Sequence, residues 1–336
     1  MKNKLLVYRA NGLFLILVLL SLLANIFVSL LTVKGIKLHI VANLVISQLI
    51  ILVPGLIFYL SISKDGMPFR IYGRIKSLTV FLLLVFTWLM MPLVTAVNIF
   101  SQLFTKNEVM NISSDVLGLP MIPVVLFIGI IGPFCEEFVF RGLINNCFVA
   151  GTGRYLMSGV VSGLFFGFMH MNLNQFCYAF VLGIIFALIN DILGSMFASF
   201  ICHAVVNTQN VLLLFISNWI MENIYGNGVS EVYTDMLNES GTAGGLRTAS
   251  LIIVLSILLV ISIVTTLLGG LLFYGICALE GKEDKFKMIF KINNKVESSE
   301  IEDSPREKVL YPTGMIAISI CIFVMFLLEP IINLFK

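Results

Sequence analysis

Charge is scarce in this sequence. Of its 336 residues, 12% are charged and 59% are hydrophobic, whereas roughly a quarter of the residues in a soluble protein are charged. The net charge is only +2, and no Lys/Arg cluster is interleaved with aromatic residues. Nucleic-acid binding is therefore not expected. The shortage of charge predicts a membrane protein.

Paired cysteines and internal repeats are also missing. None of the six cysteines forms a Cys-x-x-Cys pair, so we expect neither a disulfide framework nor a zinc knuckle. All six lie in apolar stretches, where cysteine packs as a small hydrophobic residue. The absence of a repeated half argues against a transporter built from internal repeats.

What the sequence has in abundance is long apolar segments. The first is long enough to span a bilayer, which takes about 20 residues, and is longer than the apolar part of a secretory signal, about 7–15 residues. We predict an all-α fold, a polytopic transmembrane helical bundle with about nine spans, or eight if one short pair is re-entrant. The nine segments are 12–33, 38–62, 77–103, 121–149, 155–171, 175–190, 195–220, 248–279 and 311–334.

The distribution of cations predicts the orientation of these spans. With the N-terminus in the cytosol and nine alternating helices, fifteen Lys and Arg residues fall on the cytosolic side and five on the other. Cytosolic loops carry the excess of positive charge, so we predict a multi-pass protein of the cell membrane with residues 222–247 outside. Residues 280–310, with seven cations and eight anions, should form a charged, solvated and partly disordered cytosolic loop. We expect 1–336 to be one membrane domain.

Six polar residues lie inside these apolar segments and require an explanation. Charged side chains at membrane depth are costly and usually functional. Two of the three histidines of the chain are among the six residues, which come from segments four, five and seven: Glu136, Glu137, Arg141, His170, His203 and Asn207.

Helical spacing indicates how segments four and five meet. Glycines in 151–153 mark a turn between them, and Glu136 and His170 each lie roughly 24–27 Å from it at 1.5 Å per residue. A helical hairpin would bring these two side chains to the same level. Small residues at four-residue spacing let helices approach closely, and segment five carries them as Gly159-x-x-x-Gly163-x-x-x-Gly167.

The i,i+4 spacing also relates the other four polar residues. Glu137 and Arg141 share one helical face and should form a buried pair, and His203 and Asn207 share another. Glu136 points about 100° away from Glu137 around the helix, which leaves it free of the arginine. A buried ion pair that only holds the bundle together is the structural alternative for Glu137 and Arg141.

These residue types favour hydrolysis of an amide bond. A carboxylate beside an imidazole can activate water, and a second imidazole and an amide can stabilise an oxyanion. The cofactor question stays open between none and one divalent metal such as zinc, with Glu136, His170 and His203 as ligands. No His-Glu-x-x-His, Gly-x-Ser-Gly or Gly-x-Gly-Asp motif occurs, which excludes three other kinds of intramembrane protease.

Over residues 118–220 the sequence resembles the CPBP family of intramembrane proteases, also called the CAAX-protease and bacteriocin-processing, or Abi, family. The resemblance rests on three motifs in order: Glu136-Glu137-x-x-x-Arg141, Phe166-x-x-x-His170 and His203-x-x-x-Asn207. It implies that Glu136 and His170 activate water and that His203 and Asn207 stabilise the oxyanion. It also implies that Glu137, Arg141 and Phe166 brace the site.

The resemblance implies an intramembrane endopeptidase that hydrolyses membrane-associated polypeptides, with the lipid bilayer as its surroundings and no nucleic-acid partner. The family has been described as both metalloproteases and glutamate proteases, so it leaves the metal open. The alternative is a non-catalytic membrane scaffold or immunity protein that retains the motifs. Bacterial relatives are linked with bacteriocin processing and self-immunity, and nothing in the sequence selects among these roles.

Overall fold

The computed structural model describes residues 2–63, 73–105, 107, 113–229, 231, 242–290 and 308–328, and throughout this part the regular elements are all helices. The predicted all-α fold class is confirmed. The elements in chain order are α1 (Lys2–Val33), α2 (Ile40–Ser63), α3 (Ser77–Ser101), α5 (Ser113–Leu117), α6 (Met121–Val124), η1 (Val125–Ile131), α7 (Gly132–Glu137), η2 (Phe138–Asn145), α8 (Asn146–Thr152), α9 (Tyr155–Met169), α10 (Leu173–Leu193), α11 (Met196–Tyr225), α13 (Thr242–Leu279), α14 (Glu283–Phe290), α15 (Pro312–Phe323) and η3 (Val324–Leu328).

The apolar helices correspond one by one to the nine predicted segments. Seven are long and apolar enough to cross a membrane, and α9 and the 312–327 helix are shorter apolar helices. The fourth long helix, 121–152, joins α6, η1, α7, η2 and α8 without a break. The chain is therefore a multi-pass helical membrane protein.

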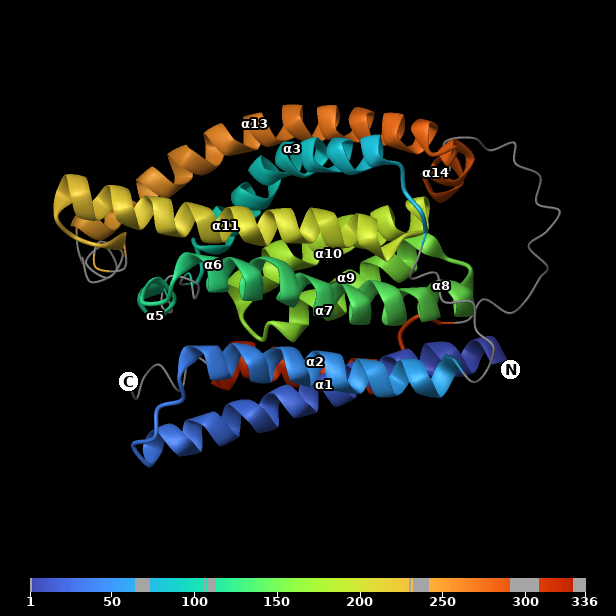
Figure 1. Cartoon of the computed structure of the whole chain (residues 1–336), viewed down its shortest axis with the longest axis horizontal. Helices are drawn as coiled ribbons and strands as arrows, with labels where there is room; N and C mark the ends of the chain where they lie inside the picture. Colours follow the sequence, from blue (N-terminus) through green and yellow to red (C-terminus); the bar gives the residue numbers. More distant parts are fainter. Residues whose placement is uncertain are drawn as a thin grey trace.

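The helices form three layers (Figure 1). The central layer holds α7 to α11, one outer layer holds α3 and α13, and the other holds α1, α2 and α15. The N-terminus and α14 lie at the same end of the bundle. This agrees with the sequence prediction that both lie on the same side of the membrane.

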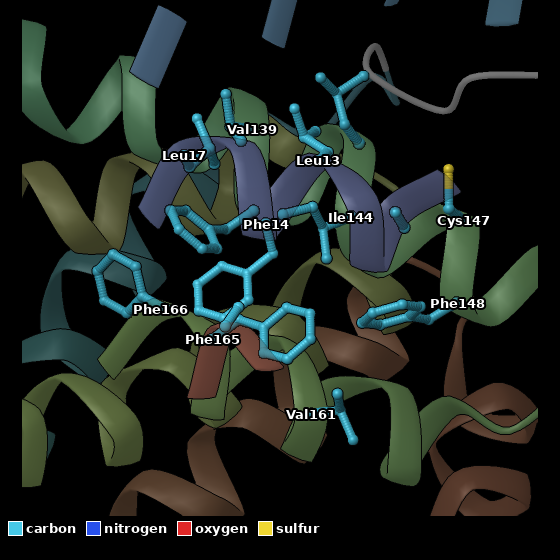
Figure 2. Packing of buried hydrophobic residues seen from close by; sticks show 14 of the residues in the cluster. Leu13, Phe14, Leu17, Val139, Ile144, Cys147, Phe148, Val161, Phe165 and Phe166 are labelled. Carbon is cyan, nitrogen blue, oxygen red and sulfur yellow. The ribbon is translucent and has the colours of Figure 1, made fainter. Parts of the chain in front are cut away.

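Aromatic side chains join α1 to the central layer. Figure 2 shows Phe14 of α1 facing Phe165 of α9, and their rings stack with centroids 3.9 Å apart. Phe148 of α8 packs edge-on against Phe165 at 5.8 Å. All three side chains are fully buried, so this cluster fixes the position of α1 against α8 and α9.

Helices α9 and α10 approach each other closely through glycines. A Cβ atom built on Gly183 would lie 2.7 Å from the Cα of Gly163, and one built on Gly163 would lie 2.9 Å from the backbone nitrogen of Ile184. At these distances a larger side chain would separate the helices. The predicted stripe of small residues in segment five therefore serves helix packing.

The loop predicted over 280–310 contains a helix. α14 follows α13 after a turn at Gly281, whose φ is +67°. Phe286 packs against Phe273 and Tyr274 of α13 at centroid distances of 6.2 and 5.4 Å, and Ile289 is buried. Residues 283–290 therefore form a helix packed on α13, and the expectation of a partly disordered loop is wrong for them. Residues 291–307 of this loop, and 230 and 232–241 of the loop predicted over 222–247, lie outside the described residues.

Candidate active site

The helix that carries the two glutamates is interrupted by wide turns. The α-helical segment α7 lies between the π-helical segments η1 and η2, and such turns are frequent at functional sites. Pro133 lacks the N–H that would bond to the carbonyl of Gly129 in an α-helix or of Ile128 in a π-helix. Thr208 and Asn207 of α11 donate to these two carbonyls, at 3.4 and 3.2 Å. Two polar side chains thus donate to both carbonyls that an N–H at position 133 could have reached.

Glu137 is the centre of a fully buried polar cluster. Its Oε1 lies 2.9 Å from Nη1 of Arg141 and 2.9 Å from Nδ1 of His203. Arg141 also donates through Nη2 to the carbonyl of Gly183, at 3.2 Å. The predicted Glu137–Arg141 pair is present, and both side chains have no exposed surface. The bond from His203 to Glu137 was not anticipated from the sequence.

Two aromatic rings surround this cluster. The guanidinium carbon of Arg141 lies 4.4 Å from the ring centroid of Phe166 and 5.3 Å from that of Phe186. Phe186 stacks on the imidazole of His203 at 5.0 Å, and Phe166 meets the rings of His170 and His203 edge-on at 5.3 and 5.6 Å. Phe166 therefore contacts the side chains of Arg141, His170 and His203. Phe186, which the motifs do not include, completes the packing of His203.

Glu136 points away from Glu137 and Arg141, as the helical spacing predicts. Its side chain is 15% exposed, and its Oε2 lies 3.7 Å from Nε2 of His203. It lines a cavity of about 440 Å³ that His170 also lines. His203 and Asn207 do not line this cavity; they lie behind Glu136 and beside η1 respectively.

His170 is placed by a tight turn at membrane depth. It caps the C-terminus of α9, which has 15 residues and is therefore about 22 Å long, less than the roughly 30 Å of bilayer hydrocarbon. The turn continues through Met171, whose φ is +50°, to Asn172, whose side chain accepts a bond from the backbone N–H of Gln175. The short helix thus ends the span inside the bundle and directs His170 toward the cavity.

Helices α1 and α2 supply the other wall of the cavity, which sequence reasoning missed. Both contribute apolar and polar side chains, the latter being Ser21, Asn25, Asn43, Ser47 and Gln48. The signal was present in the sequence as polar residues within the predicted segments 12–33 and 38–62. It was weak because uncharged polar residues are far less costly in a span than charged ones.

A metal ion at this site would need ligands grouped around one point. In the part of the chain that the structure describes, no three His, Cys, Asp or Glu side chains are grouped so that they could hold one. His203 uses Nδ1 for Glu137 and turns Nε2 toward Glu136. The arrangement of Glu136, His170 and His203 therefore does not fit the three-ligand zinc site that the residue types allowed.

The fold and this site together define a class of protein: a multi-pass helical membrane protein with a carboxylate and an imidazole facing one buried cavity. Residues 118–209 match the family described as Type II CAAX prenyl endopeptidase Rce1-like. The match confirms the family resemblance predicted from the three motifs, over a little more than a quarter of the chain. No curated protein and no solved structure matches. At the level of the family, this similarity supports an intramembrane endopeptidase of the CAAX type.

Proposed function

We propose that this protein hydrolyses peptide bonds of membrane-associated polypeptides in the cavity between α2 and the α7–α9 region, without a resident metal ion. The observation that carries the proposal is the placement of Glu136. Its carboxylate lines a cavity together with His170, while Oε1 of the neighbouring Glu137 is buried against Arg141 and His203. Two adjacent carboxylates thus have different environments, and of the two only Glu136 lines the cavity.

In the proposed reaction, Glu136 and His170 hold and deprotonate a water molecule. The water oxygen attacks the carbonyl carbon of the substrate, and the carbonyl oxygen takes up the negative charge. The C–N bond then breaks, and the proton taken from water passes to the leaving amine. A positioned general base of this kind typically contributes about 10²–10⁴-fold in rate.

We propose that His203, which lies 3.7 Å from Glu136, acts on the developing charge. Glu137 is paired with Arg141, and in this proposal it is a carboxylate that accepts the Nδ1–H of His203 across their 2.9 Å contact. The Nε2 atom, 3.7 Å from Glu136, is a donor only when the imidazole is protonated. We propose that this protonated form donates to the oxyanion.

Asn207 is the proposed second oxyanion donor. A side-chain amide carries two N–H donors, and the bond to the Ile128 carbonyl uses one of them. The second N–H is the one that would serve the oxyanion. In this proposal Asn207 both supports the turn before Pro133 and contributes to catalysis, so the two effects of its removal need separate measurements.

The cellular setting of this reaction remains as the sequence predicts it. We propose the cell membrane as its location, with the N-terminus and the 280–310 segment in the cytosol and a membrane-associated polypeptide as the partner. Processing or self-immunity reactions on bacteriocin-like peptides are one setting that fits such a substrate. The polar walls of the cavity support a polypeptide whose main chain needs hydrogen-bond partners.

The proposal is tested with Glu136→Gln, which keeps the shape of the side chain and removes the base. The reconstituted variant should lose about 10²–10⁴-fold in cleavage rate on a library of hydrophobic peptides in liposomes, with products read by mass spectrometry. Glu283→Gln on α14 is the control and should cleave at the wild-type rate. Wild-type cleavage by Glu136→Gln would reject the catalytic assignment and favour the non-catalytic scaffold.

Chelation tests the metal-free form of the proposal. Treatment with a strong chelator, followed by removal of the chelator, should leave the cleavage rate unchanged because the proposed base and donors are all side chains. Loss of cleavage that zinc restores would show that a metal is essential and would reject this mechanism.

A further inference from the structure

Helix α2 packs tightly at one end and forms a cavity wall at the other. A Cβ atom on Gly55 would lie 2.5 Å from Cγ2 of Val139 in η2, and Ile51 is buried. From Ile51 back to Asn43, by contrast, α2 lines the cavity that contains Glu136. The glycine contact therefore anchors α2 beside the site and leaves its first half facing the place where a substrate would lie.

Gln48 in this half lies close to the helix carrying Glu136. A Cβ atom on Gly132 would lie 3.5 Å from Nε2 of Gln48. Gly132 and Glu136 are i,i+4 in α7 and share one helical face. The amide of Gln48 thus lies about one helical turn from the proposed base, on the same side of α7.

The carbonyl oxygen of this amide has no hydrogen-bond partner in the described part of the protein, although it is buried. A buried polar group without a partner costs about 1–3 kcal/mol, so its retention needs a reason. The Gln48 residue lines a cavity whose other polar members on the facing elements are Glu136 and His170. A ligand that brings an N–H group into the cavity would satisfy it.

We propose that Gln48 binds the main chain of the substrate next to the bond that is cut; this inference rests on the proposed function. A side-chain amide offers both a donor and an acceptor, which matches the C=O and N–H of a peptide unit. In an intact helix these groups are bonded within the helix. Gln48 therefore selects membrane polypeptides that are locally extended at the cleavage site. It lies outside residues 118–209, so this selection comes from a part of the chain that the family match does not include.

The first measurement is binding without turnover. In the Glu136→Gln background, a fluorescent derivative of one peptide that the wild type cleaves is titrated against reconstituted protein. Gln48→Leu, which removes donor and acceptor at similar size, should raise the Kd about 3- to 10-fold, as expected for the net loss of a hydrogen bond. Gln209→Leu is the matched control, because Gln209 also has a buried side-chain oxygen without a partner in the described residues but does not line the cavity. Its Kd should be unchanged.

The second measurement separates main-chain binding from a general effect on structure. Each backbone N–H of the peptide is replaced in turn by N–CH₃. One N-methylated position should weaken binding to the Gln48 protein by the same factor as Gln48→Leu, and should have no further effect on the Gln48→Leu protein. An unchanged Kd in Gln48→Leu, or an N-methyl effect that persists fully in it, overturns the inference while leaving the proposed function intact. Absence of Glu136-dependent cleavage of any library peptide overturns both.

Discussion

Arg141 connects several helices through one buried side chain. From η2 it reaches Glu137, the carbonyl of Gly183 in α10 and the ring of Phe166 in α9. Through Glu137 it is also linked to His203 in α11. A guanidinium suits this position because its N–H groups point in several fixed directions.

Replacing this arginine should therefore lower stability as well as activity. Removing one partner of a buried ion pair typically costs about 3–5 kcal/mol, because the other charge is left uncompensated. Arg141→Ala should lose about this much in reversible unfolding in detergent, and Arg141→Lys should recover only part of it. Arg74→Ala, at an exposed position, is the control. Equal stability of Arg141→Ala and Arg74→Ala would show that the pair does not brace the site.

His203 permits a test of the proposed oxyanion donor at the residue scale. Removing one such donor typically lowers kcat about 10²–10³-fold. We expect this loss in His203→Gln, measured on the peptide cleaved by the wild type. KM should change little, because the donor acts on a charge that exists only in the transition state. A large rise in KM with unchanged kcat would contradict the role.

At the scale of the element, the turn at Pro133 makes Asn207 structurally necessary. Asn207 and Thr208 donate to the carbonyls of Ile128 and Gly129, which receive no backbone N–H from Pro133. Asn207→Ala should thus destabilise the protein by about 1–3 kcal/mol, the cost of a buried group without a partner. In a Pro133→Ala background the backbone N–H of residue 133 can donate to one of these carbonyls. Asn207→Ala should then lower the free energy of unfolding by less than it does in the wild type.

A double-mutant cycle measured by reversible unfolding checks this coupling, which should be at least about 0.5 kcal/mol for residues in one hydrogen-bond network. Activity is measured on the same variants. If Pro133→Ala/Asn207→Ala recovers stability but not cleavage, the catalytic role of Asn207 is supported. Additive free energies would contradict the structural role.

The pair α9–α10 gives a second prediction at this scale. Gly183→Ala places a methyl group 2.7 Å from the Cα of Gly163, so the helices must separate, and overpacking of this kind typically costs about 1–3 kcal/mol. It also moves the carbonyl that accepts from Arg141. Gly275→Ala in α13, where nothing lies within 4 Å of the added atom, is the control. Equal unfolding midpoints for the two variants would contradict the tight contact.

For the whole molecule, the arrangement of the helix ends predicts the topology in the membrane. The N-terminus and α14 lie at one end of the bundle (Figure 1), and α11 ends at the other. Single cysteines at Glu283 and Gly228, in a chain without its native cysteines, should react with an impermeant maleimide from opposite sides, with Glu283 on the cytosolic side. Labelling of both from the same side would contradict the nine-span topology.

The sequence by itself determined the class of the protein. Scarce charge and apolar segments of spanning length require helices in a bilayer, because lipid offers no partners for open backbone groups. Local spacing also predicted the Glu137–Arg141 pair, the turn of Glu136 away from that pair and the close packing of the glycine stripe, since each depends only on helical periodicity. The helix α14 was missed because its few apolar residues are stabilised by α13, which local composition does not reveal.

Only the tertiary structure decided how the site is assembled. His203 turns toward Glu137 and Asn207 toward the carbonyl of Ile128 because α11 packs against η1 and α7, contacts between residues some 66 and 79 positions apart. The cavity depends in the same way on the anchoring of α2 by Gly55 against η2. Sequence patterns report which face of a helix is polar, but the partner of that face is fixed by side-chain packing across helices distant in the chain. For this reason Gln48 became a candidate only when its neighbours were known.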